Sequence, residues 1–146
     1  MIIQRYEDSR KEEVCDVVLD ILVEHDFEYD RVKDADLEDI SNYYFINGGT
    51  FFIGVAEDKV VGTAGVRKCT ENLCEIRRIY LKKDFRGKGN GKKLFLTALH
   101  FAEENCSHVM LKTDHILKNA IDMYLKNGFT FQKEKKGHIY FEKNFN

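Results

Sequence analysis

The stretch CEIRRIYLKKDFRGKGNGKKL, residues 74–94, decides the fold of this 146-residue chain. Its first part completes a strand predicted over residues 73–81, and its end opens a helix predicted over residues 92–105. In the turn between them, residues 86–91, three glycines alternate with long or polar residues. Glycine adopts positive φ at low cost and leaves neighbouring N–H groups open, while a helix start adds unpaired N–H donors and partial positive charge. The turn therefore predicts a site for a phosphate or diphosphate.

The rest of the chain reads as strands and helices without a linker or repeat. We expect strands at residues 2–6, 50–57, 60–68, 73–81, 109–113, 129–131 and 138–142, with tight turns at 58–59 and 135–137. We expect helices at residues 11–24, 34–44, 92–105 and 117–127, the first with a capping box at Asp8, Ser9 and Glu12. An antiparallel meander followed by a β-α-β-α unit predicts one α/β domain over residues 1–146, with a mixed, mostly antiparallel sheet and helices on both faces.

Composition is typical of a soluble globular protein, with 43% hydrophobic and 33% charged residues. No apolar run approaches the ~20 residues that span a bilayer, and the charged start MIIQRYEDSRKEE does not resemble a secretory signal. The cysteines Cys15, Cys69, Cys74 and Cys106 show no CxxC spacing. We therefore expect a cytoplasmic protein with reduced, structural thiols, no metal site and no membrane partner.

The formal net charge of −2 conceals a strong asymmetry. Residues 1–60 carry 16 acidic and 6 basic side chains, whereas residues 61–146 carry 9 acidic and 17 basic ones. Solvated helix faces explain most such charges. The alternative is a basic half that meets an anionic cofactor and an acidic half, densest over residues 24–39, that attracts a cationic partner.

Three phosphate-binding patterns compete for the glycine turn. A P-loop requires GxxxxGK[ST], but Gly87 lies four positions before Gly91, and Lys92 is followed by Lys93 in place of a hydroxyl. A dinucleotide fold requires GxGxxG after the first strand, and here the spacing differs and the turn comes late. The third pattern, [RQ]xxGx[GA], is satisfied by Arg86, Gly89 and Gly91.

In this element order the third pattern resembles the GCN5-related N-acetyltransferase (GNAT) superfamily, over nearly the whole chain. The resemblance is strongest in residues 74–94 and in LKTDHILKNAIDMYLKNGF, residues 111–129, which carries A-x-x-x-Y-x-x-x-GF. It implies that the co-substrate is acetyl-CoA and that the glycine turn binds the diphosphate of this molecule. An exposed strand edge can bind the pantetheine amides as an added strand.

Carried over by position, the resemblance implies two groups of cofactor-binding residues. The backbone of Ile79, Tyr80 and Leu81 would pair with pantetheine where the strands 73–81 and 109–113 part. The diphosphate would bind Arg86, Gly87, Lys88, Gly89, Asn90, Gly91 and Lys92.

Two positions depart from the family pattern. Lys83 stands where a proline is common. Leu117 stands where an asparagine often binds pantetheine, and Asn119, about 200° further round a helix, is a candidate contact but no simple substitute.

Acetyl transfer needs a neutral amine, whereas an alkylamine is protonated at pH 7. The resemblance makes Glu75 the candidate base and Tyr124 the candidate acid for the CoA sulfur. The alternatives are a surface glutamate paired with Arg77 or Lys112, and a core-packing tyrosine. His115 is a weaker candidate for lining the site.

We therefore expect an N-acetyltransferase that acts on a primary amine, of a small molecule or of a protein, by direct attack in a ternary complex. The acceptor could be cationic, and the family is often dimeric. A non-catalytic acyl-CoA sensor or scaffold is the rival reading. Nucleic-acid binding is disfavoured, since no basic stripe interleaved with aromatics is present.

Overall fold

The computed structural model describes residues 1–114 and 118–145, with the side chain of Lys118 left aside. Seven strands run through these residues: β1 (Ile2–Arg5), β2 (Thr50–Ala56), β3 (Lys59–Lys68), β4 (Leu73–Leu81), β5 (His108–Asp114), β6 (Thr130–Lys135) and β7 (His138–Asn144). Three α-helices accompany them: α1 (Lys11–Glu24), α2 (Asn90–Asn105) and α3 (Lys118–Lys126). Short helical turns lie at Asp8–Arg10, Ala35–Glu38, Ser41–Phe45 and Lys83–Phe85. No helix of the described residues is long and apolar enough to cross a membrane.

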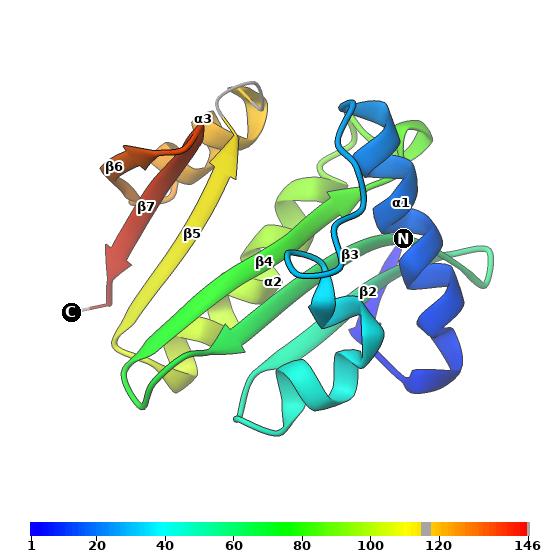
Figure 1. Ribbon diagram of the computed structural model, residues 1–146, viewed down its shortest axis with the longest axis horizontal. Helices are drawn as coiled ribbons and strands as arrows, with labels where there is room; N and C mark the ends of the chain where they lie inside the picture. The colour runs from blue at the N-terminus through cyan, green and yellow to red at the C-terminus, as the bar shows by residue number, and fades with distance from the viewer. Residues whose placement is uncertain (115–117, 146) are drawn as a thin grey trace.

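All seven strands form one sheet in the order β1-β2-β3-β4-β5-β7-β6 (Figure 1). Every neighbouring pair is antiparallel except β4 and β5, which run parallel and are connected through α2. A parallel pair needs such a crossover, because a tight turn cannot return the chain to the same end of the sheet. The mixed α/β sheet predicted from sequence is thereby confirmed.

Helices cover both faces of the sheet, and a separate hydrophobic core lies under each. Helix α1 packs over β3 and β4 on one face, and α2 packs on the other face (Figure 1). The α1 core includes Val14, Val18 and Phe51, whereas the α2 core includes Phe95 and Leu99. Helix α3 lies on the α2 side, through Tyr124.

The two hairpin turns are each formed by two residues with positive φ. Between β2 and β3, Glu57 and Asp58 both have positive φ (51° and 62°). Two-residue hairpins prefer such mirror-image turns, because the twist of these turns matches that of the flanking strands. Lys136 and Gly137 do the same between β6 and β7, with φ of 52° and 80°. The first turn lies one residue earlier than predicted.

Two local predictions at the N-terminal half were wrong. The capping box does not form: residues Asp8–Arg10 make a 3₁₀ turn, and the Asp8 carboxylate accepts a hydrogen bond from the Ser41 hydroxyl at 2.7 Å. The acidic helix expected at residues 34–44 is replaced by a 3₁₀ turn, Ala35–Glu38, and a π-helical turn, Ser41–Phe45. Its regular winding is broken because Asp36 is drawn inward along with Leu37.

The expectation of four reduced cysteines was also wrong. Cys74, at the start of β4, forms a disulfide with Cys106, which follows α2. Cys15 and Cys69 are free. No CxxC pattern marks this pair, because the two partners lie 32 residues apart and meet only when α2 has crossed the sheet.

Candidate active site

The parallel strands β4 and β5 part soon after they meet. Their paired residues are Leu73 with His108, Cys74 with Val109 and Glu75 with Met110, and the pairing goes no further among the described residues. Figure 1 shows β5 diverging from β4 from there on. The backbone of β4 from Ile76 to Leu81 therefore has no strand partner on its β5 side. This divergence was predicted, and it leaves an edge that can accept an extended ligand as an added strand.

A bulge in β4 sits beside this free edge. Gly65 of β3 pairs with Arg77 and Thr63 pairs with Tyr80, so two residues of β4 face a single residue of β3. Arg78 has a φ of 58°, an uncommon conformation for a residue with a long side chain. The Thr63 hydroxyl donates a 2.7 Å hydrogen bond to the Arg78 carbonyl. Bulges of this kind re-aim side chains and are enriched next to active sites.

The bulge turns Arg78 into a buried ion-pair network on the α1 face. Its guanidinium donates to Asp36 at 2.7 and 3.0 Å and to Asp34 at 2.8 Å, and the Tyr44 hydroxyl donates to Asp36 at 2.6 Å. Burial disfavours the charged form of Asp36, but the hydrogen bonds and charge of Arg78 outweigh it and hold the pKa of Asp36 below the ordinary aspartate value. Sequence reasoning missed this network. The signal for it was Arg77 followed directly by Arg78 within a buried strand, since neighbours on a regular strand face opposite sides.

The glycine turn has the backbone geometry that the predicted anion site requires. Gly87 and Gly89 both have a φ of 81°, and a Cβ at either position would meet no atom within 4 Å. Their conformation, and not crowding, is what requires glycine. Within the described residues, no acceptor is assigned to the N–H groups of Gly87, Lys88 or Gly89. The first N–H groups of α2, which begins at Asn90, are also unpaired within the helix.

Arg86 does not point freely into this cradle. Its guanidinium makes two hydrogen bonds to the Glu24 carboxylate, at 2.5 and 2.7 Å, and a third to the Leu81 carbonyl at 2.9 Å. The hydrogen bonds from Arg86 lower the pKa of Glu24. The side chain of Arg86 therefore joins the end of α1 to the end of β4, while the turn's backbone remains open.

Tyr124 lies on α3 within the α2-side core. Its ring packs against Phe95, Phe129 and Phe141, at centroid distances of 5.2 to 6.2 Å. Burial raises the pKa of Tyr124 well above that of a free tyrosine, and nearby Tyr80 adds to the shift. Its hydroxyl has no hydrogen-bond partner in the part of the chain that the structure describes. A buried, protonated phenol is suited to donate a proton.

Glu75 lies on the opposite face of the sheet from Tyr124. It is 8% exposed, and its carboxylate lies 3.8 Å from the Arg67 guanidinium on the neighbouring strand β3. The sequence alternatives for a partner were Arg77 and Lys112, and the structure instead places Arg67 across from it. Cys74 points into the α2-side core, on the opposite face from its strand neighbour Glu75.

Three other predicted positions fall outside this arrangement. Asn119 lies exposed on α3, and the structure assigns it no contact with the turn. His115 and Leu117 lie outside the described residues. In the described residues, no group of three or more His, Cys, Asp or Glu side chains could hold a metal ion.

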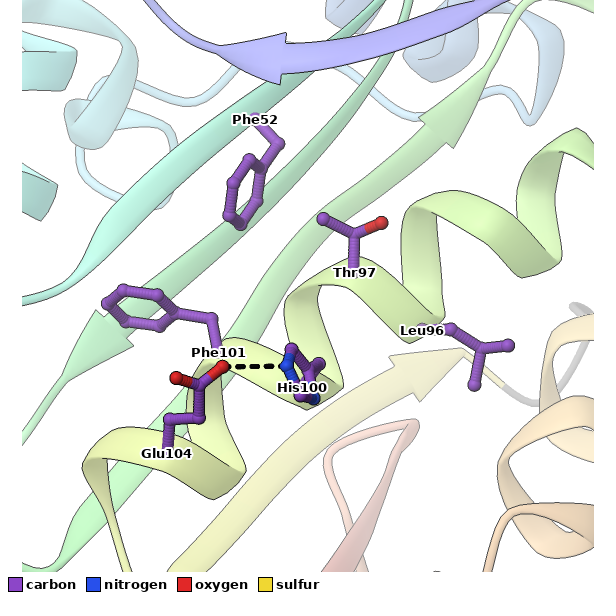
Figure 2. A pocket seen from close by; sticks show the side chains of 6 residues that line it. All are labelled: Phe52, Leu96, Thr97, His100, Phe101 and Glu104. Atoms are coloured by element: carbon purple, nitrogen blue, oxygen red, sulfur yellow. Dashed lines mark ion pairs between the residues drawn. The ribbon is translucent and has the colours of Figure 1, made fainter.

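A hollow of the surface lies away from this site. It has a volume of about 470 Å³ and lies between α2 and β2, lined by Phe52, Leu96, Thr97, His100, Phe101 and Glu104 (Figure 2). Its polar groups are largely satisfied, because His100 pairs with Glu104 at 2.7 Å. With two phenylalanines and no free cation it lacks the chemistry of a diphosphate site.

Comparison with known proteins favours the third of the phosphate-binding patterns considered for the glycine turn. The family model described as "Acetyltransferase (GNAT) family" matches residues 16–129. The chain belongs to this family. The matched range, residues 16–129, includes the glycine turn, the parted strands and Tyr124.

Curated GNAT relatives are longer than this chain. An uncharacterized N-acetyltransferase, YjgM, of Escherichia coli is 33% identical over 102 residues, which cover 67% of this chain and 61% of that protein. N-acetylaspartate synthetase of Xenopus tropicalis is 36% identical over 108 residues, covering 72% and 40%. The chain thus spans about three fifths or less of these relatives.

Solved GNAT structures match the whole fold. A GNAT-family acetyltransferase from Staphylococcus aureus superimposes with a TM-score of 0.90 at 26% identity, covering 99% of both chains. PaiA N-acetyltransferase from Thermoplasma acidophilum, solved in complex with coenzyme A, has a TM-score of 0.72 at 17% identity and covers 98% of both chains. The second likeness concerns the fold alone.

Proposed function

We propose that this chain is an acetyl-CoA-dependent N-acetyltransferase that acts on a primary amine. The observation that carries the proposal is the continuity of the free β4 edge, Ile76 to Leu81, with the open N–H groups of the glycine turn. An extended pantetheine could pair with the edge through Ile79, Tyr80 and Leu81 while its diphosphate reaches residues 86–92. The open space over Gly87 and Gly89 fits a diphosphate drawn close to the backbone.

Glu75 and Tyr124 would serve the two proton transfers. The amine nitrogen attacks the thioester carbonyl, a C–N bond forms and the C–S bond breaks. Glu75 accepts the proton that the amine loses, directly or through water, and passes it to solvent. Tyr124 donates a proton to the departing thiolate and regains one from solvent.

The remaining sequence predictions stand as part of this proposal. A cationic acceptor, a homodimer and a cytoplasmic location remain proposals, and the Cys74–Cys106 disulfide is uncommon in a cytoplasmic protein. The printed names of relatives differ in acceptor: N-acetylaspartate synthetase is named for an amino-acid product, whereas a structural neighbour from Brucella melitensis is named for the alanine of a ribosomal protein.

The test combines binding and turnover. Calorimetry with acetyl-CoA measures the donor site, and release of CoA thiol in the presence of an amine panel measures transfer. Glu75→Gln should leave acetyl-CoA binding intact and lower kcat by ~100-fold or more, most at low pH, where more of the amine is protonated. Glu71→Gln, an exposed glutamate in the preceding turn, is the matched control.

Two results would contradict the proposal. Unchanged turnover of Glu75→Gln across the pH range would remove Glu75 from the mechanism. Binding of acetyl-CoA without thiol release for any amine would instead support the rival reading, a non-catalytic acyl-CoA-binding module.

A further inference from the structure

Arg67 is an unusual arginine for its surroundings. Its side chain is 44% exposed, and its nearest opposite charge is Glu75, 3.8 Å away, which is beyond hydrogen-bond distance. No hydrogen bond from its guanidinium is assigned within the described residues, although an arginine carries five N–H donors. The guanidinium is steadied by the Tyr43 ring, whose centroid lies 5.6 Å away. Arg67 is thus a positioned cation whose N–H donors have no assigned acceptor among the described residues.

Two carboxylates on the α1 face of the sheet, those of Asp34 and Asp36, are already paired with an arginine of the protein. Asp34 and Asp36 accept hydrogen bonds from Arg78, and Arg77 donates to the Tyr43 hydroxyl. The acidic segment therefore does not present these two groups to a cationic acceptor. Beside the parting strands, Arg67 and Glu75 lie across from each other on β3 and β4 as a pair of opposite sign.

Further cationic character comes from β5. Met110 pairs with Glu75 in the parallel register, and Lys112, two residues on, lies on the same face and is exposed. Glu142 of β7, across from Met110, is the acidic side chain on this face one strand further away. Arg67, across from Glu75 on β3, is thus the positive group that the register places beside Glu75, whereas Lys112 lies further along β5, where that strand diverges from β4.

We propose that the amine acceptor also carries a carboxylate a few bonds from its nitrogen, as an amino acid does, and that Arg67 binds this carboxylate. The inference rests on the proposed function, because it concerns the acceptor of the same transfer. A zwitterion complements the pair: its ammonium meets the Glu75 carboxylate and its carboxylate meets the Arg67 guanidinium. The 3.8 Å separation of the two protein groups suits a ligand whose own charges are close together.

Binding of the carboxylate also helps the chemistry. An acceptor carboxylate at Arg67 draws the guanidinium away from Glu75, which is then left to accept the amine proton. Transfer forms the C–N bond, breaks the C–S bond and yields an N-acetylated acid and CoA. The carboxylate itself is unchanged, so Arg67 is a binding residue and not a proton carrier.

The experiment uses thiol release with free L-amino acids, each paired with its own α-carboxamide, together with simple alkylamines and short peptides. A charge-assisted contact predicts that kcat/KM is ~10- to 100-fold higher for the acid than for its carboxamide. Arg67→Gln should erase that preference by lowering kcat/KM for the acid alone, mainly through KM. Arg67→Lys should keep part of it, because the charge remains and the fork is lost. Arg31→Gln, an exposed arginine outside the site, should behave as wild type.

The outcomes separate this inference from the proposed function. Thiol release with alkylamines or carboxamides at the same kcat/KM as with the acids would overturn the inference and leave an acetyltransferase. An unchanged acid preference in Arg67→Gln would overturn it as well. Absence of release with every amine would overturn both. Acetyl-CoA binding and thermal melting of each variant show that the donor site and fold are intact, as expected for an exposed strand residue.

Discussion

Replacing Asp36 by asparagine should destabilise the protein strongly although the change is nearly isosteric. Asp36 is 1% exposed and accepts two hydrogen bonds from Arg78 and one from Tyr44. The amide cannot supply the charge or both acceptor oxygens, so Arg78 is left buried with Asp34 as its counter-ion. Breaking a buried pair in this way costs about 3 kcal/mol. For a chain of 146 residues, that corresponds to a fall of roughly 10 °C in Tm.

The assay is chemical and thermal denaturation of Asp36→Asn beside Asp16→Asn, an exposed aspartate on α1. The control should lie within about 0.5 kcal/mol of wild type. A loss below about 1 kcal/mol in Asp36→Asn would refute the reasoning, since Arg78 would then need no counter-charge at position 36.

The pH dependence of stability gives a second measure of the same group. The pKa of Asp36 is lowered on folding, so its contribution is fully present above the ordinary aspartate pKa of about 3.9. The contribution is lost as the pH falls through the lowered value. Wild type should therefore lose stability more steeply than Asp36→Asn below about pH 4, and parallel curves would contradict the assignment.

Three further substitutions test the donor site, with Gly137→Ala as a control for the first. Gly89→Ala and Gly137→Ala should each cost ~1 kcal/mol of folding stability, because both residues have φ near 80°. Only Gly89→Ala should weaken acetyl-CoA binding in calorimetry. Equal acetyl-CoA affinities of the two variants would exclude the turn from the site. Glu24→Gln frees Arg86 from an exposed ion pair and should tighten acetyl-CoA binding by roughly 2- to 5-fold, whereas weaker binding would show that Glu24 holds Arg86 in its useful position. Tyr124→Phe should stay within about 1 kcal/mol of the wild-type stability, since the Tyr124 hydroxyl has no assigned partner among the described residues. The same variant should lower kcat by ~100-fold. A loss of kcat of less than a few-fold would make Tyr124 a packing residue.

The donor side of the site could be predicted from sequence because local rules govern it. Glycine at positive φ and unpaired N–H groups at a helix start follow from Gly87, Gly89 and the apolar spacing of α2. The parting of β4 from β5 did not follow from these rules. It came from the resemblance, and the register then confirmed it at Glu75 and Met110.

The acceptor side could not be predicted in the same way, because it depends on contacts between distant segments. Arg78 meets Asp34 and Asp36 across more than 40 residues, and no local pattern states which carboxylate is buried. The bulge at Arg78 adds one residue to β4, and a single added residue reverses the facing of those that follow. A helix pattern for residues 34–44 was therefore plausible locally and wrong in the fold.

The charge asymmetry of the sequence acquires a different meaning in the folded chain. Four ion pairs among the described residues join carboxylates of the acidic first half to arginines of the basic second half: Glu24 to Arg86, Asp34 to Arg78, and Asp36 to both Arg77 and Arg78. Part of the asymmetry is therefore neutralised internally, so it need not signal a cationic partner. Arg67 escapes this pairing, since its one nearby carboxylate is Glu75 of its own half. Because Asp34 and Asp36 are held by Arg78 while Arg67 stays exposed, an acceptor that brings its own carboxylate meets complementary charge at Arg67 that a polyamine would not.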